Sequence, residues 1–540
     1  MSYNNTSNID VSEKKKIQQR DSIVIEDVPN TKIADFETAI TAAGTGKFQY
    51  LLIIGIIPVS WGSSIDTANM SMILASAECD LGLSLFNKGL LNAITYVGMV
   101  LSGFMWGYLA DVKGRKKIIL YGYMADGICN ILAGFSQNFE TLVFFKFLSG
   151  FIVSGPHATL VAYCSEFYGA KDRAKIPLLV GFSVSFGCIV NAAFAWLVIP
   201  QPWSIVFWDG AFVYNSWRIY LSICGLPMLI GAFCFCFFPE SPKFLMSQDR
   251  NEDALEVFKK IYSINTGLPK DNYPIRALGD VNLNNTIERS HSSKSQNNTK
   301  SLKDGIQQMK PMFLNPNLPR ILLFVTIQFC GMLCLNTIRL WQPQLFATIE
   351  NFNSLDTNIT NPTFCEILDI STSVKNKTAA LEEMSNCENI VISDSIYIDT
   401  IIVSATSSVF IFCASIYVNY LQHKYLSLVS YGCALLCSIS LIWSTNTLIT
   451  LILTCLYVGL MSKAFNVTLG ATVLLFPTSL RTMAVSMEMI IGRVGAMIGN
   501  LVFPILLEYS CVAPIINLAC FNLLCMLLTC FSPSTRKHAV

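Results

Sequence analysis

The chain has 540 residues, of which 52% are hydrophobic and only 14% are charged. A chain this apolar cannot cover its surface with polar groups, so the composition excludes an ordinary soluble protein and indicates a membrane protein. The net charge of +1 gives no reason to expect nucleic acid as a partner, and most of the nineteen cysteines lie inside apolar runs, where cysteine acts as a small hydrophobe.

Residues 1–47 form a polar tail before the first apolar run. The tail lacks the short apolar core and cleavage site of a signal peptide, so we expect it to stay in the cytosol. Residues 33–40 carry apolar side chains at helical spacing and predict a short helix along the membrane surface, whereas residues 1–30 are expected to be disordered.

Twelve apolar runs are long enough to cross a hydrocarbon core, which takes about 20 residues. The loops on one side carry cations such as Lys171, Arg173 and Lys175, while the other side is poor in them, which indicates that the first side is cytoplasmic. The sequence therefore predicts an all-α membrane protein with twelve transmembrane helices and with both termini, including a tail at 532–540, in the cytoplasm. We place the spans at 48–72, 88–110, 118–136, 140–163, 176–200, 217–238, 320–341, 397–420, 425–443, 447–472, 482–506 and 512–531.

A short polar turn, from Gly107 to Lys117, joins the second and third spans. Gly114 allows the chain to reverse, and Asp111 stands at a helix end where it can pair with cations of a neighbouring helix. The cations alone fit any positive-inside loop. The whole string G-Y-L-A-D-V-K-G-R-K-K, however, resembles the signature loop of the major facilitator superfamily.

An internal repeat divides the chain into two halves. An offset of 308 residues carries Arg173 onto Arg481 and maps spans two to five onto spans eight to eleven. We therefore expect two parallel six-helix halves, at 48–238 and 320–531. The same offset replaces Asp111 and Glu166 of the first half by neutral residues in the second.

These charges predict a network of Asp111, Arg115, Glu166 and Arg173 that holds the cytoplasmic ends of the first half together when the protein faces outward. The second half is expected to lack such a network. The predicted cytoplasmic gate comprises Asp111, Gly114, Arg115, Glu166, Arg173, Glu240 and Arg481.

A cytoplasmic linker, 239–319, separates the halves. Pro239 ends the sixth span, and the string Pro-Glu-Ser-Pro-Lys-Phe-Leu that it begins resembles the sugar-porter and organic-ion branches of the superfamily. Residues 251–262 predict an amphipathic helix docked under the bundle, and residues 265–310 are expected to be disordered.

Several further strings resemble the synaptic vesicle glycoprotein 2 family over roughly 40–265 and 320–530. They include Ser76-Ala-Glu78, Asn87-Lys-Gly-Leu90, Ala195-Trp196-Leu-Val-Ile-Pro200 and Ser216-Trp217-Arg218. The resemblance implies the fold of organic cation and anion transporters and a secretory vesicle, synaptic-like vesicle or plasma membrane. The chain departs from the family in its shorter loop after the seventh span, and in having Phe465 and Leu469 where the tenth span of the family carries tryptophan and an acid.

Ionisable groups at membrane depth are the candidate site residues, because each is costly unless it is paired or wet. Asp66 in the first span and Arg493 in the eleventh are expected to flank a midplane site with Trp61 and Trp341 as apolar walls. The alternative is local pairing, for example of Arg493 with Glu488. Arg339 and Lys463 are further candidates that either face the cavity or extend to a membrane surface, Lys146 either matches a family cation or packs helices, and His157 is expected to be a satisfied polar residue.

The loop at 342–396 is expected to lie outside the cytosol. It holds the sequons at Asn358 and Asn376, which we predict to be glycosylated, and Cys365 and Cys387, which we predict to form a disulfide.

The sequence shows no nucleotide loop, metal cluster or nucleophile triad, so we expect neither an enzyme nor a cofactor. We expect a secondary transporter that moves a small organic solute, an organic ion or a sugar, by alternating access within the lipid bilayer. The alternative is a vesicle glycoprotein that transports weakly or not at all and acts through protein partners.

Overall fold

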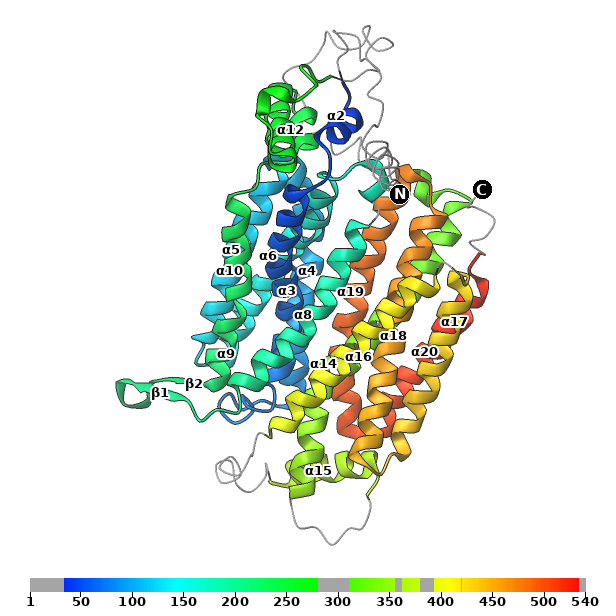
Figure 1. The fold of residues 1–540 in the computed structure, drawn as a ribbon. Coiled ribbons are helices and arrows are strands. Elements are labelled where there is room, and N and C mark those ends of the chain that lie inside the picture. The colour runs from blue at the N-terminus through cyan, green and yellow to red at the C-terminus, as the bar shows by residue number, and fades with distance from the viewer. Residues whose placement is uncertain are drawn as a thin grey trace, which may run out of the picture.

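The computed structural model describes residues 34–173, 175–279, 310–354, 362–378, 393–418 and 420–533. Within these ranges, twelve long helical segments run side by side through one bundle (Figure 1). Ten of them are long and apolar enough to cross a membrane, and α4 and α5 pack in the same bundle without meeting that criterion. The segments are α3 (Lys47–Ile73), α4 (Leu85–Lys113), α5 (Arg115–Gly134), α6 (Phe139–Ser165), α8 (Ile176–Val198), α9 (Ser216–Cys224) continued by α10 (Leu226–Cys236), α14 (Asn317–Ser354), α16 (Asp394–Tyr417), α17 (His423–Ser440), α18 (Thr447–Leu475), α19 (Thr478–Tyr509) and α20 (Val512–Phe531).

The bundle consists of two halves, which Figure 1 shows as a blue-to-green group, α3 to α10, beside a group that runs from the green α14 to the red α20. The C-terminal half has an apolar core around Trp341 and Tyr457. Two apolar cores fill the N-terminal half, one around Tyr123 and the other around Trp217. The halves touch mainly through α4 against α19 and α8 against α16. The predicted twelve-helix, two-half membrane fold is confirmed.

Close packing inside the N-terminal half depends on small residues. Gly150 of α6 faces the backbone of Thr95 on α4, and Gly98 of α4 faces the backbone of Phe147 on α6, with no room for a Cβ at either glycine. A side chain on either glycine would force the two helices apart, so these residues set how closely α4 and α6 approach.

The face that carries Gly114, which we call the predicted cytoplasmic face, is covered by α2 (Phe36–Ala43), α7 (Ala170–Arg173), α11 (Pro242–Ser247) and α12 (Asn251–Thr266). Asn265 of α12 joins this helix to the turn between α2 and α3. Its side chain donates to Gly44 O at 2.9 Å and accepts from the Phe48 N–H at 2.9 Å. The Tyr273 hydroxyl donates to Ala39 O at 2.7 Å, after the short 3-10 turn η2 (Lys270–Asn272). The disorder expected from residue 265 onward is therefore wrong for 265–279, where tertiary contacts order the chain, while 280–309 lie outside the described residues.

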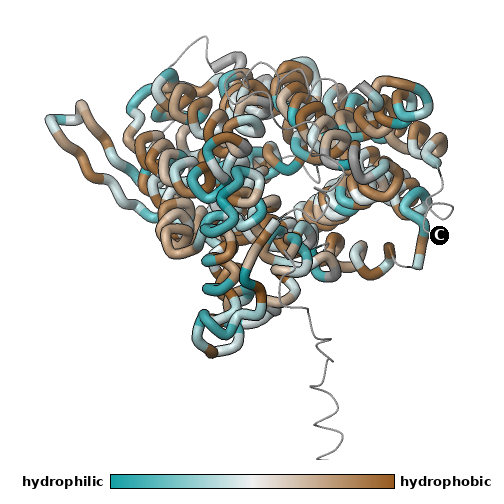
Figure 2. The backbone as a smooth tube through the Cα atoms, turned by 90° about the horizontal axis from the view of Figure 1, so that it is seen from above, coloured by the Kyte–Doolittle hydropathy of each residue, from teal (hydrophilic) through white to brown (hydrophobic). Residues whose placement is uncertain are grey.

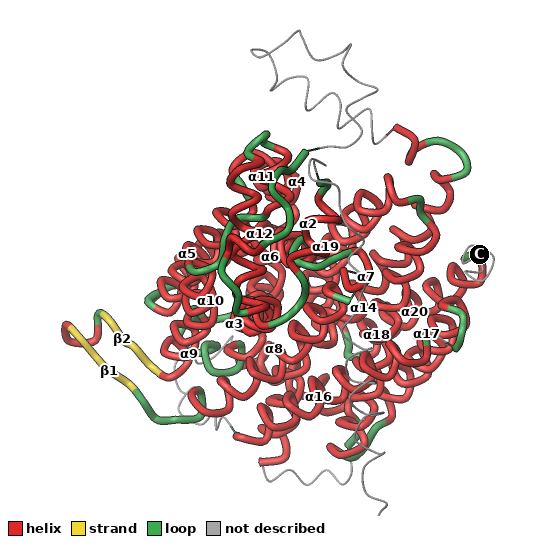
Figure 3. The backbone as a smooth tube through the Cα atoms, turned by 45° about the horizontal axis from the view of Figure 1, so that its top comes forward, coloured by secondary structure: helices red, strands yellow, loops and turns green. Residues whose placement is uncertain are grey.

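The opposite face carries a hairpin of β1 (Ser204–Phe207) and β2 (Phe212–Asn215), which pair antiparallel with Ser204 opposite Asn215 around the turn η1 (Trp208–Gly210). The hairpin projects sideways from the bundle (Figures 2 and 3). Its base is fixed because the Gln137 side chain exchanges two hydrogen bonds with the Val213 backbone, each 3.1 Å long. Trp208 at the tip is 81% exposed, which leaves an apolar surface beside the bundle.

The seventh span is longer than predicted, and α15 (Phe364–Thr378) lies within the predicted loop 342–396. Cys365 on α15 is bonded to Cys511 beside α20, 146 residues away, so the predicted bridge to Cys387 is wrong. Helix α15 lies against the α19–α20 connection, where the Asp369 carboxylate also accepts from the Cys511 N–H at 2.6 Å. Cys387 itself lies outside the described residues, and Cys79 is also disulfide-bonded.

Candidate functional site

A buried charge cluster lies inside the N-terminal half, where α3, α5 and α6 meet. The Lys146 ammonium donates to Asp66 Oδ1 at 2.5 Å and to Asn130 Oδ1 at 3.0 Å. The Ser149 hydroxyl lies 2.6 Å from Asp66 Oδ1 and 2.8 Å from Asp126 Oδ1. Because a hydroxyl carries one proton, Ser149 can donate to only one of these carboxylates at a time.

The cluster holds two carboxylates for one ammonium group, and all three side chains are buried. Within the described part of the chain, neither Asp66 Oδ2 nor Asp126 Oδ2 has a hydrogen-bond partner. The cluster therefore has one more carboxylate than it has ammonium groups, and an unpaired charge at this depth is expensive. The sequence analysis missed Asp126, although a carboxylate in mid-span is the same signal that singled out Asp66.

A second polar cluster lies between the two halves. Arg493 of α19 donates from Nη1 to the Ser154 hydroxyl of α6 at 3.0 Å. Arg339 of α14 points toward the Tyr96 hydroxyl of α4, with Nη2 at 3.4 Å. That hydroxyl donates to Asn336 Oδ1 of α14 at 3.0 Å. The two arginines therefore bring charge from the C-terminal half to polar groups of the N-terminal half.

The structure does not bring Asp66 and Arg493 together, because each has its own partner inside a different cluster. The alternative pairing of Arg493 with Glu488 does not occur either: Glu488 is buried in the C-terminal half and accepts from the Thr472 hydroxyl at 2.6 Å. Asp66 thus marks one site and Arg493 another.

The remaining predicted site residues fall outside both clusters. Trp61 packs against Phe186 of α8, with ring centroids 5.7 Å apart. Trp341 is fully buried in the C-terminal core, where its ring lies 5.0 Å from that of Phe503. Lys463 lies on α18, within electrostatic range of cysteines on α16 and α17. None of these three contacts supports a shared pocket with Asp66 or Arg493.

At the predicted cytoplasmic face, Arg115 forms an ion pair with Glu166, which also accepts from the Ser241 hydroxyl. Gly114 has φ near +99°, a backbone conformation that favours glycine, and a Cβ there would lie 2.6 Å from Glu240 Oε2. Glu240 Oε1 in turn accepts from the Lys116 N–H at 2.9 Å. The signature turn is therefore fastened to the start of the linker.

The other predicted gate residues do not join this pair. Arg173 instead binds Glu37 of α2 at 2.6 Å and lies over the Phe36 ring. Burial and the nearby Arg173 and Arg115 cations lower the pKa of Lys243. Arg481 is partly buried on α19, and its Nε has no hydrogen-bond partner in the described ranges. Asp111 lies in the last turn of α4, and its side chain lies outside the described part of the structure.

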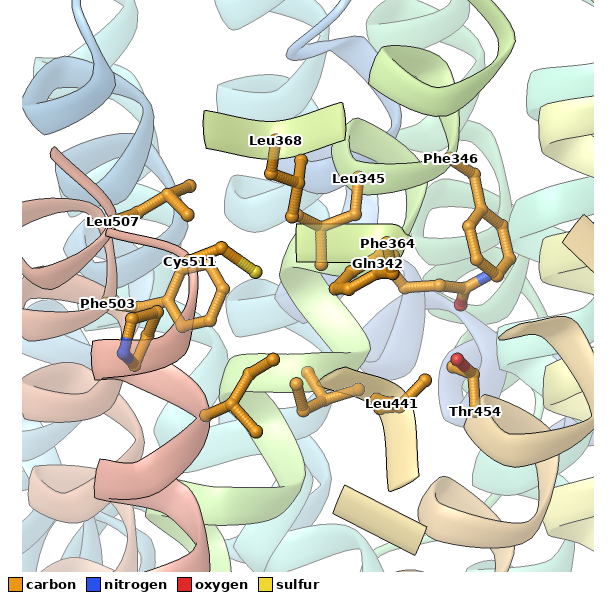
Figure 4. A pocket seen from close by; sticks show the side chains of 13 residues that line it. Gln342, Leu345, Phe346, Phe364, Leu368, Leu441, Thr454, Phe503, Leu507 and Cys511 are labelled. Carbon is orange, nitrogen blue, oxygen red and sulfur yellow. The ribbon is translucent and has the colours of Figure 1, made fainter. Parts of the chain in front are cut away.

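A separate apolar pocket lies in the C-terminal half, under α15 (Figure 4). It is enclosed by α14, α15, α18, α19, the start of α20 and the 3-10 turn η5 (Leu441–Trp443), with Gln342 and Thr454 as its polar lining. Neither arginine of the interface cluster lines it. Of the two predicted glycosylation sites, Asn376 falls within α15 and Asn358 lies outside the described residues.

Two six-helix halves with polar clusters inside and between them define a membrane protein of the major facilitator class. A family model described as "Sugar (and other) transporter" matches residues 38–361, and the chain belongs to this family. The predicted superfamily is thereby confirmed.

Among curated proteins, the chain is similar to synaptic vesicle glycoprotein 2B of Rattus norvegicus, with 30% identity over 231 residues that make up 43% of this chain and 34% of the relative. It is also 30% identical to synaptic vesicle glycoprotein 2C of Homo sapiens, over 43% of this chain and 32% of the relative. The matched part thus spans about a third of these relatives. The resemblance to the synaptic vesicle glycoprotein 2 family is confirmed.

Solved structures share the fold at low sequence identity. The xylose transporter XylE from E. coli, in a partially occluded inward-open conformation, has a TM-score of 0.61 at 14% identity, over 90% of this chain and 100% of that chain. A bacterial homologue of the human lysosomal transporter Spinster has a TM-score of 0.57 at 11% identity, over 92% and 98%.

Proposed function

We propose that this protein is a secondary transporter that moves a small organic solute across a vesicle or plasma membrane by alternating access. The family assignment supports membrane transport in general, and the vesicle location follows from the similarity to the synaptic vesicle glycoproteins. The observation that carries the proposal is the polar interface cluster, in which Arg493 meets Ser154 and Arg339 meets Tyr96 across the two halves.

Charged groups at the interface between the halves are better explained as part of a solute path than as a purely structural contact. A static bundle gains nothing from charges placed between its halves, since apolar side chains of the same size would pack there at lower cost. Where the halves rock, the same groups are exposed to water in turn and can bind a polar solute.

Contacts toward the opposite face support a closed state on that side. Gly89 of α4 lies directly against Asn500 and Pro504 of α19, and the Asn92 amide donates to Leu340 O at 3.3 Å. Such contacts must break whenever the site opens to that face.

The cluster of Asp66, Asp126 and Lys146 is the proposed coupling site. Taking up or releasing one proton changes the charge of a group that joins α3, α5 and α6, so protonation is able to bias how these helices pack. Among the described residues, the other titratable groups within electrostatic range of the cluster are Tyr123 and Cys129 of α5 and Cys224 of α9. None of these three is a carboxylate, so the two aspartates are the expected proton carriers.

The test is uptake of sugars, organic anions and organic cations into proteoliposomes at several external pH values, normalised to folded protein. We expect uptake in the native protein to vary with pH by up to about tenfold per unit, the limit for one coupled proton. Asp66→Asn and Asp126→Asn are expected to abolish this dependence, whereas Asp209→Asn at the exposed hairpin tip is expected to preserve it.

Two results would count against the proposal. The same pH dependence in both mutants as in the native protein would remove the cluster from coupling. If no solute enters faster than into protein-free liposomes, the transport function itself fails, and a glycoprotein that acts through protein partners becomes the better account.

A further inference from the structure

We infer, resting on the proposed transport function, that the solute carries a negatively charged group, a carboxylate, sulfonate or phosphate, which binds between Arg339 and Arg493. The two arginines reach the interface from α14 and α19, and both lead to the same turn of α4. Arg339 lies 3.4 Å from the Tyr96 hydroxyl, and Arg493 binds Ser154, whose hydroxyl donates to Met99 O at 3.3 Å. Tyr96 and Met99 are one turn apart on α4, so the two arginines share one region between the halves.

Neither guanidinium is well satisfied by protein groups. Arg339 reaches Tyr96 only at 3.4 Å and the Cys188 sulfur at 4.0 Å, both at the long limit for hydrogen bonds, and its Nε lacks a partner in the described ranges. Arg493 has one good hydrogen bond, to the Ser154 hydroxyl at 3.0 Å. Most of the ten N–H donors on the two groups thus remain available to a ligand.

The charge of the cluster is also uncompensated. Among the described residues, no carboxylate lies within ion-pair distance of Arg339 or Arg493, and the side chains within hydrogen-bond reach of the two guanidinium groups are Tyr96, Cys188 and Ser154. Two buried cations inside the N-terminal half, by contrast, do have carboxylate partners: Lys146 binds Asp66, and Arg218 binds Asp80 at 3.0 Å. The chain therefore neutralises these two cations and leaves Arg339 and Arg493 without a carboxylate at the interface.

An anionic ligand supplies what this cluster lacks. A carboxylate or phosphate accepts two parallel hydrogen bonds from a guanidinium and cancels its charge, whereas a neutral sugar hydroxyl cancels none and a cation would be repelled. His157, one turn from Ser154 on α6, lies within electrostatic range of Arg493, and its Nδ1 has no partner among the described residues. It is a further polar contact for the same ligand.

The experiment compares solutes that share a skeleton and differ in charge, using the full chain in proteoliposomes. One set is glucuronate, glucose and glucosamine, which share a pyranose ring, and the other is benzenesulfonate, benzamide and benzyltrimethylammonium, which share a phenyl ring. Uptake is measured for the native protein, Arg339→Gln, Arg493→Gln and, as the matched surface control, Arg250→Gln, whose partner Asp253 lies on exposed α12. Arg493→Lys serves as the variant that keeps the charge.

We expect the anion of at least one set to be taken up in preference to its neutral and cationic counterparts. Its uptake should fall about tenfold or more in Arg339→Gln and Arg493→Gln, stay unchanged in Arg250→Gln, and be partly retained in Arg493→Lys. A melting temperature raised by the anion in the native protein, and not in the Gln variants, reports binding independently of folded yield.

The outcomes separate the two hypotheses. Uptake of a neutral or cationic member that the Gln variants leave unchanged overturns the anionic class and keeps transport. Anion uptake that survives both Gln substitutions overturns the site. Absence of uptake for every solute, relative to protein-free liposomes, contradicts the proposed function and the inference together.

Discussion

Charged residues in the N-terminal half obtain their partners from other helices or from loops between helices. Lys88 of α4 binds Glu78 at 2.7 Å, Lys146 of α6 binds Asp66 of α3, and Arg115 binds Glu166 beside the linker. Each pair therefore adds an electrostatic link between two separate segments that also pack through apolar side chains. Removing one member leaves the other charge without compensation, which costs more than the pair contributes as a whole.

Loss of the Glu166 carboxylate is therefore expected to destabilise the protein. The change Glu166→Gln leaves Arg115 without its carboxylate and weakens the bond to Ser241, so we expect the free energy of unfolding to fall by about 2 kcal/mol. The matched control is Glu256→Gln on exposed α12, whose contacts with Lys259 at 3.3 Å and Lys270 at 3.8 Å are solvent-screened. We expect Glu256→Gln to lower the free energy of unfolding by less than about 0.5 kcal/mol.

Both values are read from denaturant unfolding in a fixed lipid–detergent mixture. Equal costs for the two variants would mean that the Arg115–Glu166 pair does not fasten this face. The predicted network of Asp111 holds the cytoplasmic ends of the first half together when the protein faces outward. We therefore also expect Asp111→Asn to favour the inward-facing state, which labelling of cytoplasmic cavity cysteines would show.

Helix α15 closes the C-terminal half on the opposite face. Its apolar side chains, including Phe364 and Leu368, cover the pocket of Figure 4, and Cys365 fastens it to Cys511. A helix of 15 residues is marginal by itself, so α15 depends on its buried side chains Phe364, Ile367 and Leu368, on this covalent link and on the Asp369 hydrogen bond.

Loss of the disulfide is expected to destabilise the protein. Because the bridge closes a loop of 146 residues, we expect Cys511→Ser to lower stability by about 3–5 kcal/mol. Cys365→Ser should cost the same, and the double variant no more than either one. Cys433→Ser, which removes an exposed free thiol, is the control and should change nothing.

Stability is measured by thermal unfolding under oxidising and reducing conditions, and non-reducing peptide mapping identifies the bonded pair. Recovery of a peptide that joins Cys365 to Cys387, instead of Cys511, would contradict the structure at this point.

For the whole molecule, the contact between α4 and α19 decides how closely the halves approach on the opposite face. Gly89 lies where a Cβ would be 2.6 Å from Asn500 O and 2.7 Å from Pro504 Cγ. Gly107, on the same helix but nearer the predicted cytoplasmic face, has no such neighbour within 4 Å. Only the first position therefore limits closure of the halves.

We accordingly expect Gly89→Ala to disfavour the closed arrangement by about 1–3 kcal/mol, because one side must give way. Accessibility labelling at the opposite face should rise severalfold, while Gly107→Ala should leave it unchanged. An equal response in the two variants would show that the α4–α19 contact is not the closing surface.

The twelve spans, the two halves and the superfamily signature follow from the sequence alone. These features depend on hydrophobic length and local composition, which a reader can see within a window of about 20 residues. Even the candidate residues Asp66, Arg339 and Arg493 follow from a charge inside an apolar run.

Which of these groups meet depends on how the helices pack in the whole bundle. Lys146 lies 80 residues from Asp66, and Arg493 lies 339 residues from Ser154. Arg173 forms an ion pair with Glu37 and not with Glu166, and Cys365 forms a disulfide with Cys511 and not with Cys387. These choices depend on which helix faces pack together, a property of the complete bundle that no local pattern of residues contains.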